Sequence, residues 1–104
     1  MLSASTTLER LSEWYLRHCN GDWEHGFGFS ISTLDNPGAS IKIDLEDTEL
    51  HKIPFEEIKQ DRDSEDHWLV CRRTETVFEA YGAATRFEDM LKIFLDWADA
   101  HRTI

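Results

Sequence analysis

The chain has 104 residues and a mass of 12.2 kDa, enough for one hydrophobic core and too little for two. Hydrophobic residues make up 40% of it, with five glycines and two prolines, which excludes disordered, collagen-like and disulfide-scaffold proteins. Eleven Lys and Arg against 21 Asp and Glu give a net charge of -10. This charge repels nucleic acids and anionic lipids and attracts basic protein surfaces. We therefore expect one domain over residues 1–104 and a protein partner, with no nucleic acid and no membrane.

The cysteine content and the N-terminus indicate the compartment. Cys19 and Cys71 are too few for a disulfide framework and fit a reducing cytoplasm. The first seven residues lack the basic start and the apolar stretch of a signal peptide. The longest unbroken apolar run, residues 68–71, is far shorter than the roughly 20 residues that cross a bilayer. We expect a cytoplasmic protein without a membrane span.

An amphipathic helix is predicted near the N-terminus. Thr6 and Glu9 have the spacing of a capping box. Apolar residues then recur at helical spacing on one face: Leu8, Leu11, Tyr15 and Cys19. The helix should run from about residue 7 to residue 19 and end at Asn20-Gly21, because glycine readily adopts the left-handed conformation past a helix C-terminus.

Two strands then form a predicted hairpin. Residues 27–31 alternate apolar side chains with small ones, and residues 41–45 alternate apolar side chains with charged ones. A period of two is typical of a strand that buries one face, so we expect one buried face in each strand. The segment 34–38, Leu-Asp-Asn-Pro-Gly, has the proline and glycine of a turn between them.

Charge is concentrated in the middle of the chain. Residues 44–66, here called the acidic segment, hold ten acidic and three basic residues, a net -7 of the total of -10. Residues 53–58 suggest a third strand, which Pro54 confines to a sheet edge or an irregular start. The segment has two interpretations: a surface that mimics a nucleic-acid backbone or covers a basic active site, or a solvated edge that discourages aggregation.

A second hairpin and a helix complete the chain. Apolar residues at 68–70 and 77–81 flank a polar turn at 72–76. Residues 85–88 repeat the capping-box spacing. An apolar stripe follows along the last helix: Phe87, Met90, Leu91, Phe94, Leu95 and Ala98. The order of elements predicts an α+β fold, a four- or five-stranded, mostly antiparallel sheet with an N-terminal and a C-terminal helix packed on one face.

Residues 19–26 are dense in chemical groups and lie between a helix and a strand, where loops often carry function. His18, Cys19 and His25 lack the paired spacing of metal ligands, so no metal site is expected. Cys19 lies on the apolar helix face, where a thiol is usually an inert buried side chain rather than a nucleophile.

Two further interpretations concern the same loop. Asp22, Glu24 and His25 could divide acid and base roles, although close carboxylates arise easily by chance among 21 of them. Trp23 is most simply an aromatic side chain that fills the junction between helix and sheet. The sequence has no phosphate loop, nucleophile elbow or dinucleotide fingerprint. We expect neither an enzyme nor a cofactor.

Several motifs match a known family in order and spacing. In the first half they are Trp14-Tyr15, Cys-Asn-Gly-Asp-Trp-Glu-His at 19–25, Thr-Leu-Asp-Asn-Pro-Gly at 33–38 and Ile-Asp-Leu at 43–45. In the second half they are Pro54-Phe55, Trp-Leu-Val-Cys-Arg at 68–72 and Phe-Leu-Asp-Trp-Ala at 94–98. Together they resemble the immunity protein 53 family of bacterial polymorphic toxin systems, over nearly the whole chain. Gly-Asp-Trp-Glu-His and Leu-Asp-Asn-Pro-Gly are the most specific parts.

The resemblance implies a cytoplasmic, non-catalytic protein that binds a cognate bacterial toxin domain and blocks it. The polar loop residues are expected to lie close together at the loop end of the sheet and to contact the toxin, with an aromatic anchor among them. The proposed contact residues are Asp22, Trp23, Glu24, Asp35 and Asn36. If these motifs are architectural instead, the acidic stretch from residue 46 to residue 66 becomes the contact surface.

Two other functional classes stay open at this point. One is a small hydrolase or transferase with Asp22, Glu24 and His25 as acid and base groups, and the other is an adaptor without a toxin. Gene context separates them, because an immunity gene should follow a toxin gene and an enzyme gene should lie among pathway genes. The sequence leaves the oligomeric state open.

Overall fold

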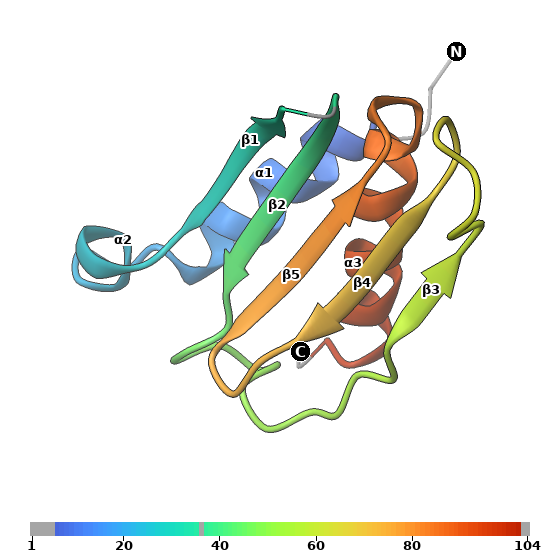
Figure 1. The fold of residues 1–104 in the computed structure, drawn as a ribbon. Coiled ribbons are helices and arrows are strands. Elements are labelled where there is room, and N and C mark those ends of the chain that lie inside the picture. The colour runs from blue at the N-terminus through green and yellow to red at the C-terminus, as the bar shows by residue number, and fades with distance from the viewer. Residues whose placement is uncertain (1–5, 36, 103–104) are drawn as a thin grey trace, which may run out of the picture.

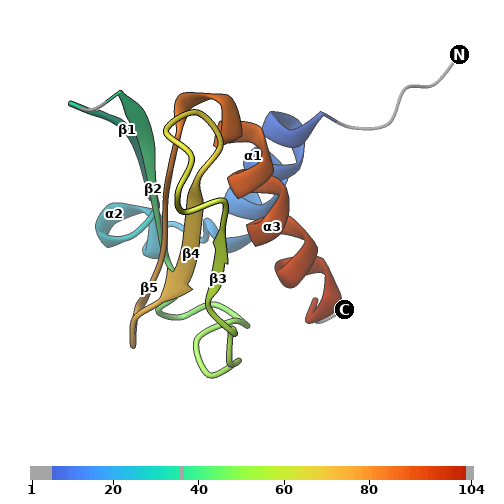
Figure 2. The same ribbon diagram turned by 45° about the vertical axis from the view of Figure 1, so that its right-hand side comes forward.

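Two helices cover one face of a five-stranded antiparallel sheet (Figures 1 and 2). The computed structural model describes residues 6–35 and 37–102. The helices on the covered face are α1 (Thr7–His18) and α3 (Phe87–Ala100). In spatial order the strands are β1 (Phe29–Leu34), β2 (Gly38–Asp44), β5 (Val77–Gly82), β4 (Leu69–Arg73) and β3 (Ile58–Gln60). A short helix α2 (Trp23–Gly26) and a 3-10 turn η1 (Ala84–Arg86) complete the fold. The predicted α+β architecture is confirmed.

The first helix begins as predicted but buries a different face. The Thr6 hydroxyl accepts a hydrogen bond from the Glu9 N–H at 3.0 Å, and the Glu9 carboxylate accepts one from the Thr6 N–H at 2.8 Å. The buried face centres on Leu11 and Trp14, whereas Leu8 is 59% exposed. The reason is the size of Trp14, whose ring packs edge-on against Phe94 of α3 at 5.1 Å and so draws its own side of α1 into the core.

The capping box predicted at residues 85–88 is wrong. The Thr85 hydroxyl donates to the backbone carbonyl of Asp66, and the Glu88 carboxylate accepts from the Thr7 hydroxyl at 2.9 Å. Tertiary partners thus take both side chains, and α3 begins after η1 without a side-chain cap. The predicted apolar stripe is confirmed in its buried members: Met90, Leu91, Phe94, Leu95 and Ala98.

Both predicted hairpins form, and the two sheet edges differ from expectation. β1 pairs with β2 and β4 pairs with β5. The third strand, β3, is short and begins further along the sequence than predicted. Residues 53–55 instead form a loop that packs against α3, where the Trp97 indole donates to the Pro54 carbonyl at 3.1 Å. The expected buried face of the first strand is wrong, since Phe29 is 38% and Ile31 41% exposed. β1 is one of the two edge strands of the sheet, and Figure 1 shows α1 crossing behind β1 and β2. Phe29 meets α1 through Tyr15, at 5.6 Å between the ring centres, but still keeps more than a third of its surface exposed.

The sheet is closely packed where its central strands meet the loops. A Cβ on Gly38 would lie 2.6 Å from the Gly82 carbonyl oxygen, and a Cβ on Gly82 would lie 2.9 Å from that of Trp68. Both distances are below those of real contacts, so the backbone approach requires glycine at both positions.

Two arginines hold the acidic segment against the sheet. The Arg73 guanidinium at the end of β4 donates to five backbone carbonyls: Leu50, His51, Ile53, Thr74 and Glu75, at 2.5–2.9 Å. Arg86 binds the Gln60 side chain at 2.6 Å, the Asp61 carboxylate at 3.3 Å and the His67 carbonyl at 2.5 Å. A chain stretch rich in like charges is thereby ordered through its carbonyl groups.

We expect Arg73→Lys to lower the free energy of unfolding by about 2–4 kcal/mol, because an ammonium group cannot reach the five carbonyls that the planar guanidinium binds together. The neighbouring Arg72→Lys is the matched control. Arg72 is exposed, pairs with Glu79 and lies 5.7 Å from the centre of the Tyr81 ring. Lysine can keep both contacts, so its substitution should change the stability by less than about 0.5 kcal/mol. Urea denaturation measures both values, and equal effects would contradict the anchoring role of Arg73.

Candidate functional site

The loop at residues 20–26 is built by its own polar side chains. The Asn20 side-chain oxygen accepts hydrogen bonds from the N–H groups of Asp22 and Trp23, both at 2.9 Å. The Glu24 carboxylate accepts from the N–H groups of Asn20 and Gly21, at 2.9 and 2.8 Å. Gly21 has φ 91°, a conformation that glycine adopts without strain. The specific Gly-Asp-Trp-Glu-His motif is therefore first of all a loop-forming motif.

Trp23 lies in the core rather than on the surface. Its side chain is 4% exposed, and its indole N–H donates to the Glu46 carbonyl at 2.9 Å. Its ring centre lies 6.1 Å from that of Trp14 and 5.8 Å from that of Tyr15. This is the junction-filling role that the simpler sequence interpretation predicts. Trp23 therefore fastens the loop to α1 and to the start of the acidic segment.

The acid/base alternative gains no support from this loop. Hydrogen bonds from the backbone N–H groups of Glu24 itself, Asn20 and Gly21 hold the pKa of the Glu24 carboxyl below its ordinary value, against a smaller opposing effect of burial. A general acid needs a raised pKa, and Glu24 is instead a fixed acceptor. Asp22 and His25 are exposed. Cys19 is half-buried and its thiol donates to the Tyr15 carbonyl at 3.3 Å, while burial raises the pKa of the Cys71 thiol to about 12.

The predicted contact residues do not form one cluster. Asp22 and Glu24 precede β1, and Asp35 follows it, so the two groups lie at opposite ends of that strand (Figure 1). Six residues of strand separate them by about 20 Å. The expectation that they lie close together is wrong, because a segment that enters a strand and the turn that leaves it are necessarily at its two ends. Asn36 lies outside the described residues.

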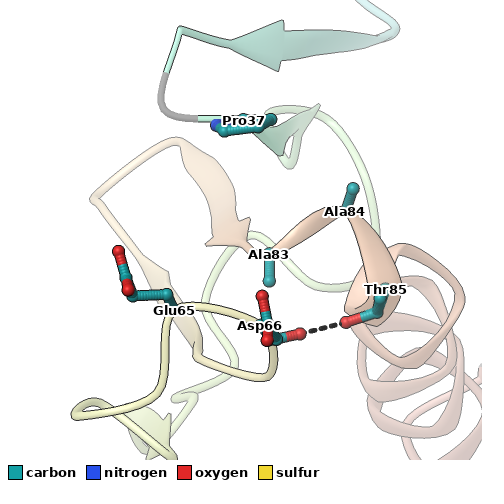
Figure 3. A pocket seen from close by; sticks show the side chains of 6 residues that line it. All are labelled: Pro37, Glu65, Asp66, Ala83, Ala84 and Thr85. Carbon is teal, nitrogen blue, oxygen red and sulfur yellow. Dashed lines mark hydrogen bonds between the residues drawn. The ribbon is translucent and has the colours of Figure 1, made fainter.

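Each of the two loop motifs instead has a residue that shares a pocket with carboxylates of the acidic segment. Asp22 and Asp47 line one pocket of about 420 Å³ next to α2. At the other end of the sheet, Pro37 lines a pocket of about 290 Å³ together with Glu65 and Asp66 (Figure 3). Loop motif and acidic segment were alternative contact surfaces on sequence grounds. In the structure they adjoin at both ends of the sheet, which sequence spacing does not reveal.

Part of the acidic segment has hydrogen-bond or ion-pair partners within the chain. Glu49 accepts from the His18 ring at 2.6 Å, Glu57 lies 3.5 Å from the Lys59 amine, and Asp61 pairs with Arg86. In the part of the chain that the structure describes, several exposed carboxylates of the segment have no ion-pair partner: Asp47, Glu56, Asp63, Glu65 and Asp66. These carboxylates make the surface electrostatically suited to a basic partner.

Two other kinds of site were sought within residues 6–35 and 37–102. No group of three or more His, Cys, Asp and Glu side chains in these ranges could hold a metal ion. None of the helices described there is both long enough and apolar enough to span a bilayer.

Substitutions of the neighbouring residues Asp22 and Trp23 test which of the two maintains the fold. Trp23→Ala should lower the free energy of unfolding by about 3–5 kcal/mol, because it empties a core position and leaves the Glu46 carbonyl without its donor. Asp22→Ala should change it by less than about 0.5 kcal/mol, since its exposed side chain makes no capping bond. Thermal or urea unfolding of both variants is the test, and a stable Trp23→Ala protein would contradict the assignment.

Comparison with known proteins agrees with the motifs. The family model described as immunity protein 53 matches residues 8–99, from the first turn of α1 to the last turn of α3. No curated protein and no solved structure matches significantly. The matched range contains every strand and both loop motifs, so the agreement covers the whole sheet. The chain belongs to the immunity protein 53 family.

Proposed function

We propose that this protein binds the cognate toxin of a bacterial polymorphic toxin system in the cytoplasm and blocks it by one-to-one association, without catalysis. The observation that carries the proposal is the family match over residues 8–99. The net charge of -10 supports it, because such a charge attracts a basic partner surface and raises its association rate.

The contact residues are proposed on the same basis. Asp22 and Asp35 are exposed and contact the toxin directly, together with the unpaired carboxylate of Asp47, which lines the same pocket as Asp22. Trp23 and Glu24 contribute by holding the loop in shape, as their burial and hydrogen bonds suggest. Asn36 stays in the proposed contact set by its place in the Leu-Asp-Asn-Pro-Gly motif.

Co-expression with the toxin domain encoded immediately upstream tests the function. Cells that make both proteins should survive induction, and the two chains should co-purify as a one-to-one complex. The controls are an empty vector, which should not protect, and a buried-core variant such as Trp23→Ala, which should protect poorly through loss of stability. Death of cells that contain the folded protein and an active toxin would overturn the proposal, and protection at far below one chain per toxin would indicate catalysis.

The salt dependence of association tests the acidic contribution. The association rate should fall at least about tenfold between 50 and 500 mM salt, because ions screen charges over a Debye length that shrinks from about 14 to about 4 Å. Asp22→Asn with Asp47→Asn should lower the rate at low salt and flatten its dependence. Stopped-flow fluorescence is suitable, and a rate independent of salt in the unsubstituted protein would exclude electrostatic steering by these groups.

A further inference from the structure

The exposed large apolar side chains lie on two neighbouring elements, α1 and β1. Among the described residues, the large hydrophobic side chains that are exposed are Leu8 and Leu16 of α1 and Phe29 and Ile31 of β1. The two elements are neighbours, since the Tyr15 ring of α1 packs edge-on against Phe29 at 5.6 Å. Scattered exposed hydrophobic residues are ordinary, whereas their concentration on adjoining elements marks a surface for contact with another protein.

The two edges of the sheet are protected very differently. The β3 edge has only three residues, one of them Lys59, and charged residues flank it on both sides. The β1 edge has six residues, Phe-Ser-Ile-Ser-Thr-Leu, with neither charge nor proline. Proteins normally blunt a free edge with short strands, lysines or prolines, because its unpaired backbone groups bind other strands. In a chain of net charge -10, an uncharged edge of this length is an open pairing site.

The hydrogen-bond register shows which backbone groups are available. The Asp44 N–H donates to the Gly28 carbonyl at 2.9 Å, so Gly28 faces β2. In an antiparallel pair, residues whose backbone groups bond to the neighbouring strand alternate with residues whose backbone groups point away from it. The backbone groups of Ser30 and Ser32 therefore also point toward β2. The N–H and C=O groups of Phe29, Ile31 and Thr33 point away from the sheet. They can accept the backbone of one further strand.

We propose that β1 is a strand-addition site, at which an extended segment of the cognate toxin joins the sheet as a sixth strand; this rests on the proposed immunity function. The centre of the segment is about five uncharged residues, with apolar side chains directed to the side of Phe29 and Ile31. Basic residues flank it, because Asp22 and Asp47 line a pocket near the start of β1 and Asp35 follows its end. The bound segment thus unites the two separated loop motifs in one interface.

A second copy of this chain fits the same edge poorly. Two-fold antiparallel pairing of β1 with itself centres on Ile31 and places Phe29 opposite Thr33. In that register Asp35 of each copy lies opposite residue 27 of the other, beside the loop that bears Asp22. Acidic groups would then meet at both ends of the paired strands, so the flanking charges favour a basic-ended foreign segment over self-association.

Amide hydrogen exchange of the protein with and without the toxin domain encoded beside its gene tests this directly. In the complex the outward amides of Phe29, Ile31 and Thr33 should exchange at least about tenfold more slowly, as amides do when they enter a ladder. The β3 edge serves as the internal control and should be unchanged. A complex that leaves the β1 amides unprotected would refute the strand-addition site alone, whereas the absence of any complex would refute the proposed function as well.

Variants provide a second test. Ile31→Pro removes one outward N–H and leaves the inward bonds of Ser30 and Ser32 in place, and Ile31→Lys blunts the edge with a charge. Each should raise the dissociation constant for the toxin domain at least about tenfold. Ala100→Lys, exposed on α3, is the charge-matched control and should stay within about threefold.

Two controls keep this test decisive. The unfolding midpoint of each variant must stay near that of the unsubstituted protein, and the exchange measurement replaces any variant that does not fold. Unchanged affinity in folded Ile31→Pro and Ile31→Lys would overturn the proposal. Sedimentation should find the toxin-free protein monomeric, and a dimer that Ile31→Pro abolishes would assign the edge to a second copy instead.

Discussion

The width of two helices is the constraint on which the rest of this structure depends. Two packed helices are about 20 Å across, whereas five strands span about 24 Å, so α1 and α3 can cover about four strands. Trp14, Phe94 and Phe78 join the two helices to the centre of the sheet through ring contacts of 5.1 Å. On the far side the loop at residues 53–55 packs against α3. β1 is the edge strand on the side of α1, which meets Phe29 through Tyr15 but leaves this side chain and that of Ile31 more than a third exposed.

The acidic segment illustrates how a highly charged stretch becomes an ordered surface. Arg73 and Arg86 bind backbone carbonyls and Gln60 as well as carboxylates, so they fix the chain without cancelling most of its charge. Only part of the charge is paired internally, for example between Asp61 and Arg86. The remaining carboxylates are held in place before a partner arrives, which reduces the entropy that binding would otherwise cost. A pre-ordered acidic surface next to an open strand edge is consistent with membership in an immunity family.

The Gly-Asp-Trp-Glu-His loop motif mainly maintains the fold, and the proposed contact surface lies mostly outside it. Asn20 and Glu24 satisfy the N–H groups of their own loop, and Trp23 is buried, so most of the motif maintains the fold. In our proposal, contact with the partner therefore belongs to exposed groups at the ends of β1 and along its edge. The two interpretations weighed on sequence grounds, loop motif or acidic segment, turn out to describe adjoining parts of one molecule. A partner bound along β1 would reach both.

The sequence by itself determined the two long helices, the two hairpins and the family, because their signals are local. The Thr6 and Glu9 cap depends on residues three apart, the strand pairs on short turns, and the α3 stripe on helical periodicity. Tertiary structure decided what long-range packing controls. Thr85 and Glu88 bind partners far away in the sequence instead of capping α3, and α1 buries Trp14 rather than Cys19 in the core. β1 lies at the edge of the sheet, and Asp22 and Asp35 lie at its opposite ends. Which strand is outermost depends on the order of pairing across the whole sheet, and no window of the sequence contains that information.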